Sequence, residues 1–344
     1  MNVGLLREVI RRRPWEVLLL ALVVGTVVFN LVESKNYLGV DNLVNLFELS
    51  IEKAVVVVIM TFVIVNGEID LSVASVMGLS AAVLAKLNDA DAVPFTLAVG
   101  IALAVGAVAG LIQGLCVAKL KLPSLVVTLA GLIGLRGGAR VLVEDRSFGD
   151  FPAWFERLGQ RPLVGPFPFG LIVFAGGLVL GGVVLARTAL GRRIYVIGDS
   201  AEVGRYSGLN VDRIKVGLFV SSGTVAAFAG VLYAARLGSV RGDLANGFEL
   251  DIVTMVLLGG VSIFGGAGTM TGVALAILIV LNLRNGLGLA NIESNIQTGV
   301  IGAILIASVL ARNALDGLRT RWDADAPLAA GDLGESNTTI GSTP

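Results

Sequence analysis

Long runs of apolar residues recur along the whole sequence, separated by short stretches that contain charges, proline or asparagine. A helix needs about 20 apolar residues to cross the hydrocarbon core of a bilayer. Ten runs of roughly this length can be delimited: 15–32, 46–65, 71–87, 94–118, 125–142, 169–186, 214–235, 251–266, 268–284 and 293–311. The pattern predicts an all-α polytopic membrane protein with about ten transmembrane helices. The helix boundaries are least clearly marked within 251–284.

The amino-acid composition agrees with this prediction. Of the 344 residues, 55% are hydrophobic, 15% are charged and 45 are glycine. Soluble domains carry about 25% charged residues and about 7% glycine, so a soluble enzyme of this size is excluded. Basic and acidic residues number 26 each, and we predict no nucleic-acid partner from this balance.

The residue types that most catalytic and metal sites use are missing. The sequence has no histidine, and its single Cys116 lies in an apolar run, which leaves no common general base and no thiolate cluster. No lysine follows a glycine, so the phosphate-binding Gly-Lys pair of a P-loop is absent. We therefore predict no catalytic residue, no metal site and no cofactor in this chain. If ATP drives its activity, ATP and magnesium bind to a separate ATPase.

The distribution of basic residues predicts the orientation in the membrane. Ten spans put both termini on one side, and cytoplasmic segments are enriched in Lys and Arg. With the amino terminus inside, 15 of the 26 basic residues are cytoplasmic. They are Arg7, Arg11, Arg12, Arg13, Lys119, Lys121, Arg187, Arg192, Arg193, Arg205, Arg213, Lys215, Arg312, Arg319 and Arg321.

The same pattern divides the chain into segments. They are a basic cytoplasmic amino terminus (1–14), a transmembrane domain (15–312) with an outer loop (143–168) and an inner loop (187–215), and a cytoplasmic tail (313–344). The run 15–32 ends without a small-x-small cleavage pattern, so we interpret it as a retained span rather than a signal peptide. Acidic and small polar residues in the tail predict disorder.

A short internal repeat links the two halves of the sequence. Glu-Ile-Asp-Leu at 68–71 and Glu-Leu-Asp-Ile at 249–252 lie 181 residues apart, and a glycine follows each aspartate at the same offset of eight residues, at Gly78 and Gly259. Five spans in each half would give the two copies opposite orientations. This predicts two inverted five-helix repeats, an arrangement common among transporters, although so short a match also arises by chance.

Two carboxylates interrupt the apolar pattern after residue 65. Within an apolar helix a carboxylate costs about 2.5 kcal/mol or more, and such groups persist mainly where they are buried in protein or face water. We therefore assign Asn66, Glu68, Asp70 and Ser72, with the repeat counterpart Asp251, to a translocation pathway. The alternative is that Asp70 only caps the next helix while Glu68 is solvated in a loop.

Arg136 and Arg140 share one helix face near the outer end of the run 125–142 because they are four residues apart. Such side chains can extend to the membrane interface. Alternatively they line an outer vestibule and bind hydroxyl groups, and on this interpretation Arg136 joins the pathway set.

Glycines form two further patterns. Gly106, Gly110 and Gly114 repeat every four residues, which allows helix backbones to approach closely in a membrane. Residues 265–272 resemble a dinucleotide-binding fingerprint, but the spacing is GxGxxxG and no βαβ unit surrounds it. We predict a tight turn between two spans instead.

Four segments, in order, carry a resemblance to a known family. They are VNGEIDLSVASVMGLSA, LPSLVVTLAGLIGLRGG, TALGRRIYVIGDSAEVGRYSGLNVDRIK and GGVSIFGGAGTMTG. They resemble motifs of the permease subunits of ribose-, xylose- and rhamnose-type ABC importers, and the resemblance covers the chain from Trp15 to about Arg312. Departures from the family pattern include Glu68, Ala74 and the pair Asp199-Ser200, where the family commonly has glycines and Gly-Asn.

The resemblance implies a place in a larger assembly of the bacterial inner membrane. Two permeases, as a homodimer or a heterodimer surrounded by membrane lipid, would enclose the pathway. An extracytoplasmic solute-binding protein would deliver the solute, and ABC ATPase subunits would drive alternating access. A short helix with a glycine exit would contact the ATPase through Glu202, Val203, Arg205, Tyr206, Ser207 and Gly208. The alternative for this segment is an ordinary solvated basic loop.

The function that the resemblance implies is import of a monosaccharide or a related polyol, with no covalent chemistry in this chain. One alternative is an ABC permease for branched-chain amino acids or for a furanosyl signal molecule. Another is an ion-coupled secondary transporter, because such proteins also combine inverted repeats with intramembrane carboxylates.

Overall fold

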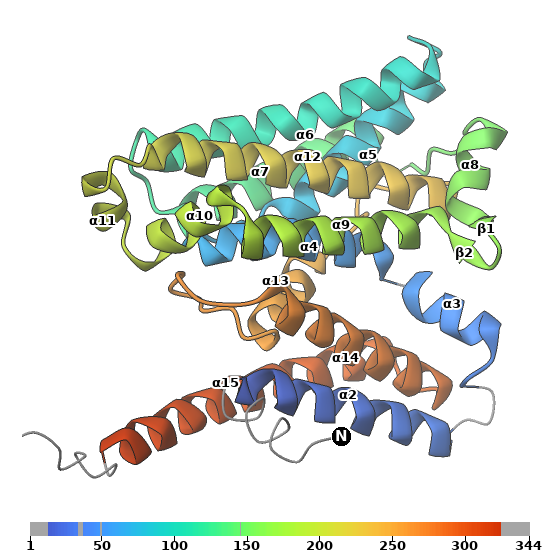
Figure 1. The fold of residues 1–344 in the computed structure, drawn as a ribbon. Helices are drawn as coiled ribbons and strands as arrows, with labels where there is room; N and C mark the ends of the chain where they lie inside the picture. Colours follow the sequence, from blue (N-terminus) through green and yellow to red (C-terminus); the bar gives the residue numbers. More distant parts are fainter. Residues whose placement is uncertain (1–12, 34–36, 49, 145, 325–344) are drawn as a thin grey trace, which may run out of the picture.

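The computed structural model describes residues 13–33, 37–48, 50–144 and 146–324, and these are almost entirely helical (Figure 1). The fourteen helices of these residues are α2 (Pro14–Glu33), α3 (Val40–Glu48), α4 (Ile51–Val65), α5 (Val73–Asp89), α6 (Phe95–Ala118), α7 (Ser124–Val143), α8 (Ala153–Gln160), α9 (Phe169–Arg187), α10 (Ala189–Asp199), α11 (Ala201–Tyr206), α12 (Val211–Leu237), α13 (Phe248–Leu258), α14 (Met270–Leu289) and α15 (Ser294–Ala324). One antiparallel hairpin pairs β1 (Pro162–Val164) with β2 (Phe167–Pro168). The prediction of an all-α polytopic membrane protein is confirmed.

Six of the described helices are long and apolar enough to cross a membrane: α2, α6, α7, α9, α12 and α14. The other four predicted runs contain shorter apolar helices. The run 46–65 is divided between α3 and α4, and the first part of α15 contains the shorter apolar helix Ser294–Ser308. Ten complete spans and the inverted repeat therefore remain predictions.

The prediction of one continuous helix over 251–266 is wrong. α13 ends at Leu258, and irregular backbone follows as far as Thr269. Positive φ angles at Gly260, Gly265, Gly266 and Gly268 explain the break, because glycine adopts this region at little cost. The predicted tight turn in this part of the chain is confirmed.

The two ends of the helical bundle differ in their structure (Figure 1). α10, α11 and the turn between α13 and α14 lie at one end, which we call the coupling end, and α8 and the hairpin lie at the opposite end. The start of α2 also lies at the coupling end, where Trp15 donates a hydrogen bond of 3.3 Å to the carbonyl oxygen of Leu258. α15 finishes there too (Figure 1), so both terminal helices have their outermost described residues at one end, as an even number of spans requires.

Two predicted segments contain more helix than the sequence pattern alone indicates. The inner loop 187–215 contains two helices, α10 and α11, and α12 already begins at Val211. Residues 313–324, predicted to belong to a disordered tail, continue α15 as helix. The remaining tail residues, 325–344, and the basic residues 1–12 lie outside the described residues.

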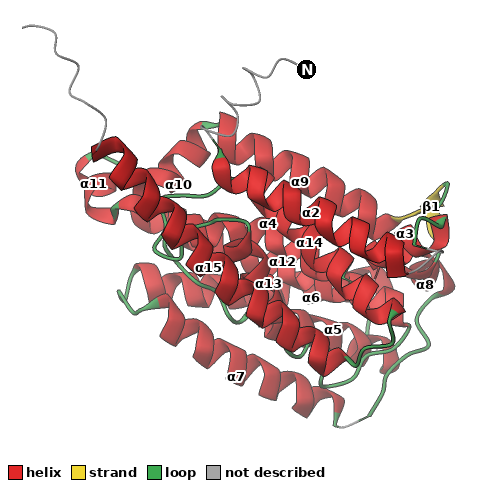
Figure 2. Ribbon diagram, turned by 90° about the horizontal axis from the view of Figure 1, so that it is seen from below, coloured by secondary structure: helices red, strands yellow, loops and turns green. Residues whose placement is uncertain are grey.

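Glycines allow α6 and α12 to pack closely against each other at the centre of the molecule. A Cβ atom built on Gly106 would lie 2.3 Å from the carbonyl oxygen of Gly223 in α12, and one on Gly110 would lie 2.2 Å from that of Phe219. The predicted close packing through these glycines is therefore confirmed. α4 is buried along nearly its whole length, and Figure 2 shows it surrounded by neighbouring helices, as expected of a helix that is almost entirely apolar on every side after its first turn.

Candidate functional site

The chain leaves its helical path between α4 and α5, at residues 66–72, which we call the break. Asn66 ends α4, and Gly67 follows with a φ of +80°, a conformation that glycine adopts most easily. Helical geometry resumes at Val73. The four adjacent candidates for the pathway, Asn66, Glu68, Asp70 and Ser72, are therefore brought together in one buried segment.

Asp70 connects three helices through uncharged partners. Its Oδ1 atom accepts hydrogen bonds from the backbone nitrogen and the hydroxyl of Ser72, at 3.0 and 2.6 Å, and its Oδ2 atom accepts one from the hydroxyl of Ser222 in α12 at 2.7 Å. The Ser72 hydroxyl also lies 2.9 Å from Oε1 of Gln113 in α6. Asp70 is only 1% exposed, so this carboxyl group is stabilised by hydroxyl and amide donors rather than by a basic side chain.

The structure changes the capping interpretation of Asp70. The N-cap of α5 is Ser72, and Asp70 lies two residues earlier, where its carboxylate accepts the backbone N–H of residue i+2, as in an Asx turn. Asp70 therefore stabilises the approach to the helix rather than capping its first turn.

The suggestion that Glu68 is solvated is wrong. Glu68 is 8% exposed, and its carboxylate forms a salt bridge with Lys215 in the first turns of α12. Because a buried carboxylate is costly without a partner, α12 supplies the counter-charge. Asn66 differs from its neighbours: it is 2% exposed, and neither its Oδ1 nor its Nδ2 has a hydrogen-bond partner among the described residues.

Asp251 lies far from the break, in the first turn of α13. Its carboxylate is bound by Lys53 at 2.7 Å and by Arg284 at 2.8 Å. Lys53 and Asn66 are 13 residues apart on α4, which corresponds to about 20 Å along a helix. The structure therefore does not bring Asp251 and Asp70 together, and the N-cap of α13 is Gly247 rather than Asp251.

Sequence reasoning missed most of the charged cluster around Asp251. Lys53 also lies 4.3 Å from the ring centre of Phe248, and beside it Glu52 accepts hydrogen bonds of 2.6 and 3.1 Å from Arg236. The available signal was the adjacent pair Glu52-Lys53 inside an otherwise apolar run. A buried charge requires a partner, but the sequence does not say which of many distant charges that partner is.

Arg136 is paired within the protein rather than extended to the membrane interface. Its Nη2 atom lies 3.2 Å from Oε2 of Glu249, and its guanidinium also donates a hydrogen bond to Asn246. Both partners belong to the region where an irregular segment, Gly238–Gly247, leads into α13. A Cβ atom built on Gly78, inside α5, would lie 3.0 Å from the carbonyl oxygen of Leu244. The irregular segment 238–247 therefore packs directly against α5, and irregular backbone within a membrane protein needs such protein or water around it.

The segment predicted to contact an ATPase folds as expected. α11 begins after Ser200, whose hydroxyl accepts the backbone N–H of Val203 at 3.3 Å, and ends before Gly208, whose φ is +76°. All of the predicted contact residues are exposed: Glu202, Val203, Arg205, Tyr206, Ser207 and Gly208. Tyr206 is 91% exposed, so the predicted helix with a glycine exit is confirmed, whereas its ATPase contact stays a prediction.

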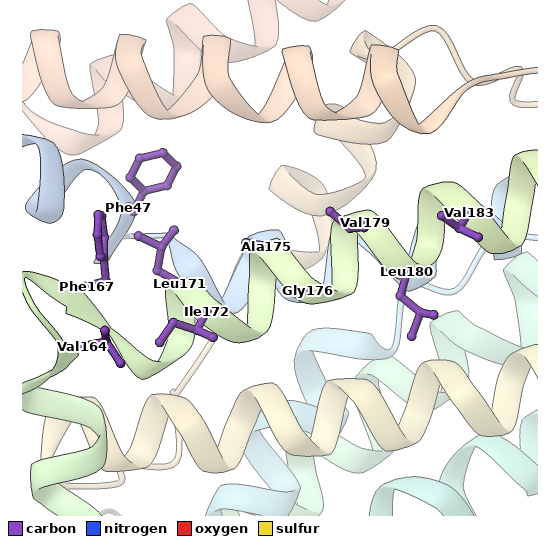
Figure 3. Close-up of a pocket in the computed structure, with 10 residues that line it drawn as sticks. All are labelled: Phe47, Val164, Phe167, Leu171, Ile172, Ala175, Gly176, Val179, Leu180 and Val183. Carbon is purple, nitrogen blue, oxygen red and sulfur yellow. The ribbon is translucent and has the colours of Figure 1, made fainter.

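Two hollows on the described part of the chain lie away from these polar groups. One, of about 940 Å³, runs along α9 and is lined only by apolar residues such as Phe47, Phe167 and Leu171 (Figure 3). The second, of about 620 Å³, lies between α4, α9 and α12 and is also mainly apolar. Such surfaces suit lipid chains better than a hydroxylated solute, which needs polar partners. Among the described residues, no three cysteine, aspartate or glutamate side chains are grouped to hold a metal ion.

Comparison with known proteins adds independent information. Residues 42–309 match the family model described as "Branched-chain amino acid transport system / permease component". The chain is 35% identical over 312 residues to the "Autoinducer 2 import system permease protein LsrD" of Yersinia pseudotuberculosis serotype O:3 (strain YPIII), covering 88% of this chain and 92% of that protein. It is 34% identical, with the same coverage, to the protein of that name from Yersinia pestis (strain Pestoides F). No solved structure matches the chain significantly.

Proposed function

The chain belongs to the family of permease components of branched-chain amino acid type transport systems, and from this premise we propose that it imports a furanosyl solute. As a member of this family, it is a multi-pass membrane subunit of a bacterial ABC importer and not itself an ATPase. An import system of this kind includes an ATPase and a solute-binding protein. The resemblance to sugar-importer permeases is confirmed at the level of the family.

One observation carries the choice of solute. The similarity to the autoinducer 2 permeases extends over 92% of their length, so it includes both the break and the irregular segment before α13. A furanosyl molecule presents several hydroxyl groups on a small ring. The furanosyl signal molecule, an alternative at the level of sequence, thus has stronger support than the monosaccharide or polyol that the sequence favoured.

The chemistry of the buried groups is compatible with an uncharged, hydroxylated solute. Glu68, Glu249 and Asp251 are already paired with basic residues of the same chain. Asn66 has both an amide donor and a carbonyl acceptor without partners among the described residues, and an amide can bind a hydroxyl group in either sense. We propose that a second permease subunit completes the pathway and that Asn66, Glu68, Asp70, Ser72, Arg136 and Asp251 lie along it or support it.

In the proposed mechanism the ATPase moves the permease between outward- and inward-facing states. ATP and magnesium bind to the ATPase, and α11 receives the movement through its exposed residues. Tyr206 and Val203 provide apolar contacts, while Asp212 holds this region to the turn between α6 and α7 through Lys121 at 2.8 Å. Rigid-body movement of helices is a common way to couple two such sites.

A branched-chain amino acid is the second candidate solute, because the family description names it. Such a zwitterion would need both an anionic and a cationic partner. We expect the paired charges described above to be unable to serve it without first separating, and a buried pair is expensive to break.

Uptake by purified permease in lipid vesicles, together with its ATPase and binding protein, tests the proposal. Labelled autoinducer 2, D-ribose and L-leucine are supplied separately, with ATP inside the vesicles. We expect ATP-dependent accumulation of autoinducer 2 above both competitors. Preference for ribose would restore the monosaccharide interpretation, and preference for leucine the amino-acid one. Uptake that follows an imposed proton gradient without ATP would show a secondary transporter instead.

A further inference from the structure

A second apolar surface, separate from α11, is exposed at the coupling end. It lies at the tip of the turn between α13 and α14, where Phe264 is 88% exposed and Ile263 is 46% exposed. Figure 1 shows this turn projecting toward the same end of the molecule as α11. Single exposed apolar residues are normal on protein surfaces, but here two neighbouring apolar side chains are exposed together on one turn.

The turn holds its tip in a fixed shape. The backbone nitrogen of Ser262 donates to the carbonyl oxygen of Ala267 at 2.9 Å, and that of Gly265 donates to Ser262 at 3.0 Å. The hydroxyl of Ser262 accepts the backbone N–H of Phe264 at 3.3 Å. These bonds close a short loop, so the Phe264 side chain is presented by a defined backbone.

The base of the turn is fixed to α10, directly before α11. The hydroxyl of Tyr195 donates to the carbonyl oxygen of Gly268 at 2.6 Å, and burial raises the pKa of Tyr195, which keeps this donor protonated. A Cβ atom built on Gly266 would lie 2.9 Å from the Cα atom of Asp199, the last residue of α10. The tip and α11 are therefore carried by the same small structural unit.

The turn also contacts the break. The backbone nitrogen of Gly266 donates to the carbonyl oxygen of Val65 at 2.9 Å. A Cβ atom built on Gly265 would lie 2.8 Å from the Cα atom of Gly67. A force applied at the tip would thus reach the end of α4 through backbone contacts, with no flexible side chain between them.

We propose that Ile263 and Phe264 form a second docking surface for the ATPase subunit, next to the surface formed by α11. This inference rests on the proposed function, which supplies the ATPase. Hydrocarbon is an unsuitable surrounding for the tip, because irregular backbone that faces lipid leaves polar groups unsatisfied. An apolar groove of a soluble partner would bury the Phe264 ring and would leave the backbone of the turn near water.

Site-specific photo-crosslinking of the complete importer in lipid vesicles tests this surface. A photoreactive residue is placed at position 264, at Val203 in α11 as the reference, and at Leu163 in the hairpin of the opposite end as the control. We expect positions 264 and 203 to crosslink to the ATPase and position 163 not to do so. Crosslinking of position 203 to the ATPase while position 264 reaches only lipid or a second permease would overturn the second surface alone. Failure of both positions would overturn the proposed function as well.

Substitution at the tip gives an independent measurement. Phe264→Asp should weaken ATPase binding to the permease by about tenfold or more, because a buried aromatic residue is a frequent energetic centre of an interface. Phe264→Leu should retain most of the binding, and Leu163→Asp should leave it unchanged. Thermal unfolding of each permease without ATPase shows whether it folds. Normal ATPase binding by folded Phe264→Asp would refute the proposal.

Discussion

Individual carboxylates in this permease are stabilised in two chemically different ways. Asp70 accepts hydrogen bonds from Ser72 and Ser222, whereas Asp251 is neutralised by Lys53 and Arg284. Hydrogen-bond networks tolerate a neutral acceptor of the same shape, but a buried pair leaves an uncompensated charge when one member is removed. The two positions that look alike in the sequence therefore differ in what they require.

At Asp70 we expect Asn to be tolerated and Ala to be damaging. Asn keeps one oxygen for Ser72, and its amide can donate to the hydroxyl of Ser222, which rotates to accept. Ala leaves buried donors unpaired, at a cost of about 1–3 kcal/mol. The measurements are thermal unfolding of the solubilised permease and uptake per inserted molecule. Equal losses for Asp70→Asn and Asp70→Ala would show that the charge itself is needed.

At Asp251 we expect the opposite result for Asn. Asp251→Asn removes the negative charge between Lys53 and Arg284 and should destabilise the protein by about 3–5 kcal/mol. The double variant Asp251→Asn with Lys53→Met removes one of the opposed positive charges and should recover part of that loss. Thermal unfolding of the single and double variants checks this prediction. An Asp251→Asn protein as stable as the parent would contradict the assigned pairing.

At the scale of elements, α6 and α12 approach so closely that glycine is required between them. Gly110→Ala places its Cβ atom where the carbonyl oxygen of Phe219 lies 2.2 Å away, so the helices must separate. Gly134 in α7 is the matched control, because nothing lies within 4 Å of a Cβ atom there. We expect Gly110→Ala to lower the unfolding temperature and Gly134→Ala to preserve or raise it, since alanine favours helix by about 1 kcal/mol. Indistinguishable unfolding temperatures would argue against close packing.

The exit from α11 also depends on one glycine. Gly208 has a φ of +76°, and its backbone nitrogen donates to Arg205 at 3.0 Å. Proline fixes φ near −65° and lacks this donor, whereas asparagine tolerates positive φ. We expect Gly208→Pro to abolish uptake and ATPase binding while insertion stays intact, and Gly208→Asn to retain most of both.

Glu202→Arg, which changes only an exposed charge, should also reduce ATPase binding. Normal uptake by Gly208→Pro and Glu202→Arg would refute the coupling role of α11.

For the whole molecule, the clusters of basic residues predict that the coupling end faces the cytoplasm. In a Cys116→Ala background, a cysteine at the exposed position Arg193 in α10 should resist an impermeant thiol reagent added outside intact cells. A cysteine at Leu163, 56% exposed in the hairpin of the opposite end, should react. Both sites should react after the cells are opened. Labelling of position 193 from outside would reverse the orientation.

The sequence by itself determined the class of protein, most helices, the close approach at Gly106 and Gly110, and the shape of α11. These features depend on local properties, namely apolar run length, the absence of a side chain and the dihedral freedom of glycine. Only the tertiary structure decided which charges meet. Glu68 pairs with Lys215 and Asp251 with Lys53, at separations of 147 and 198 residues. Because burying an unpaired charge is costly, the sequence shows that each buried charge needs a partner. Which residue is that partner depends on how helices distant in sequence pack together.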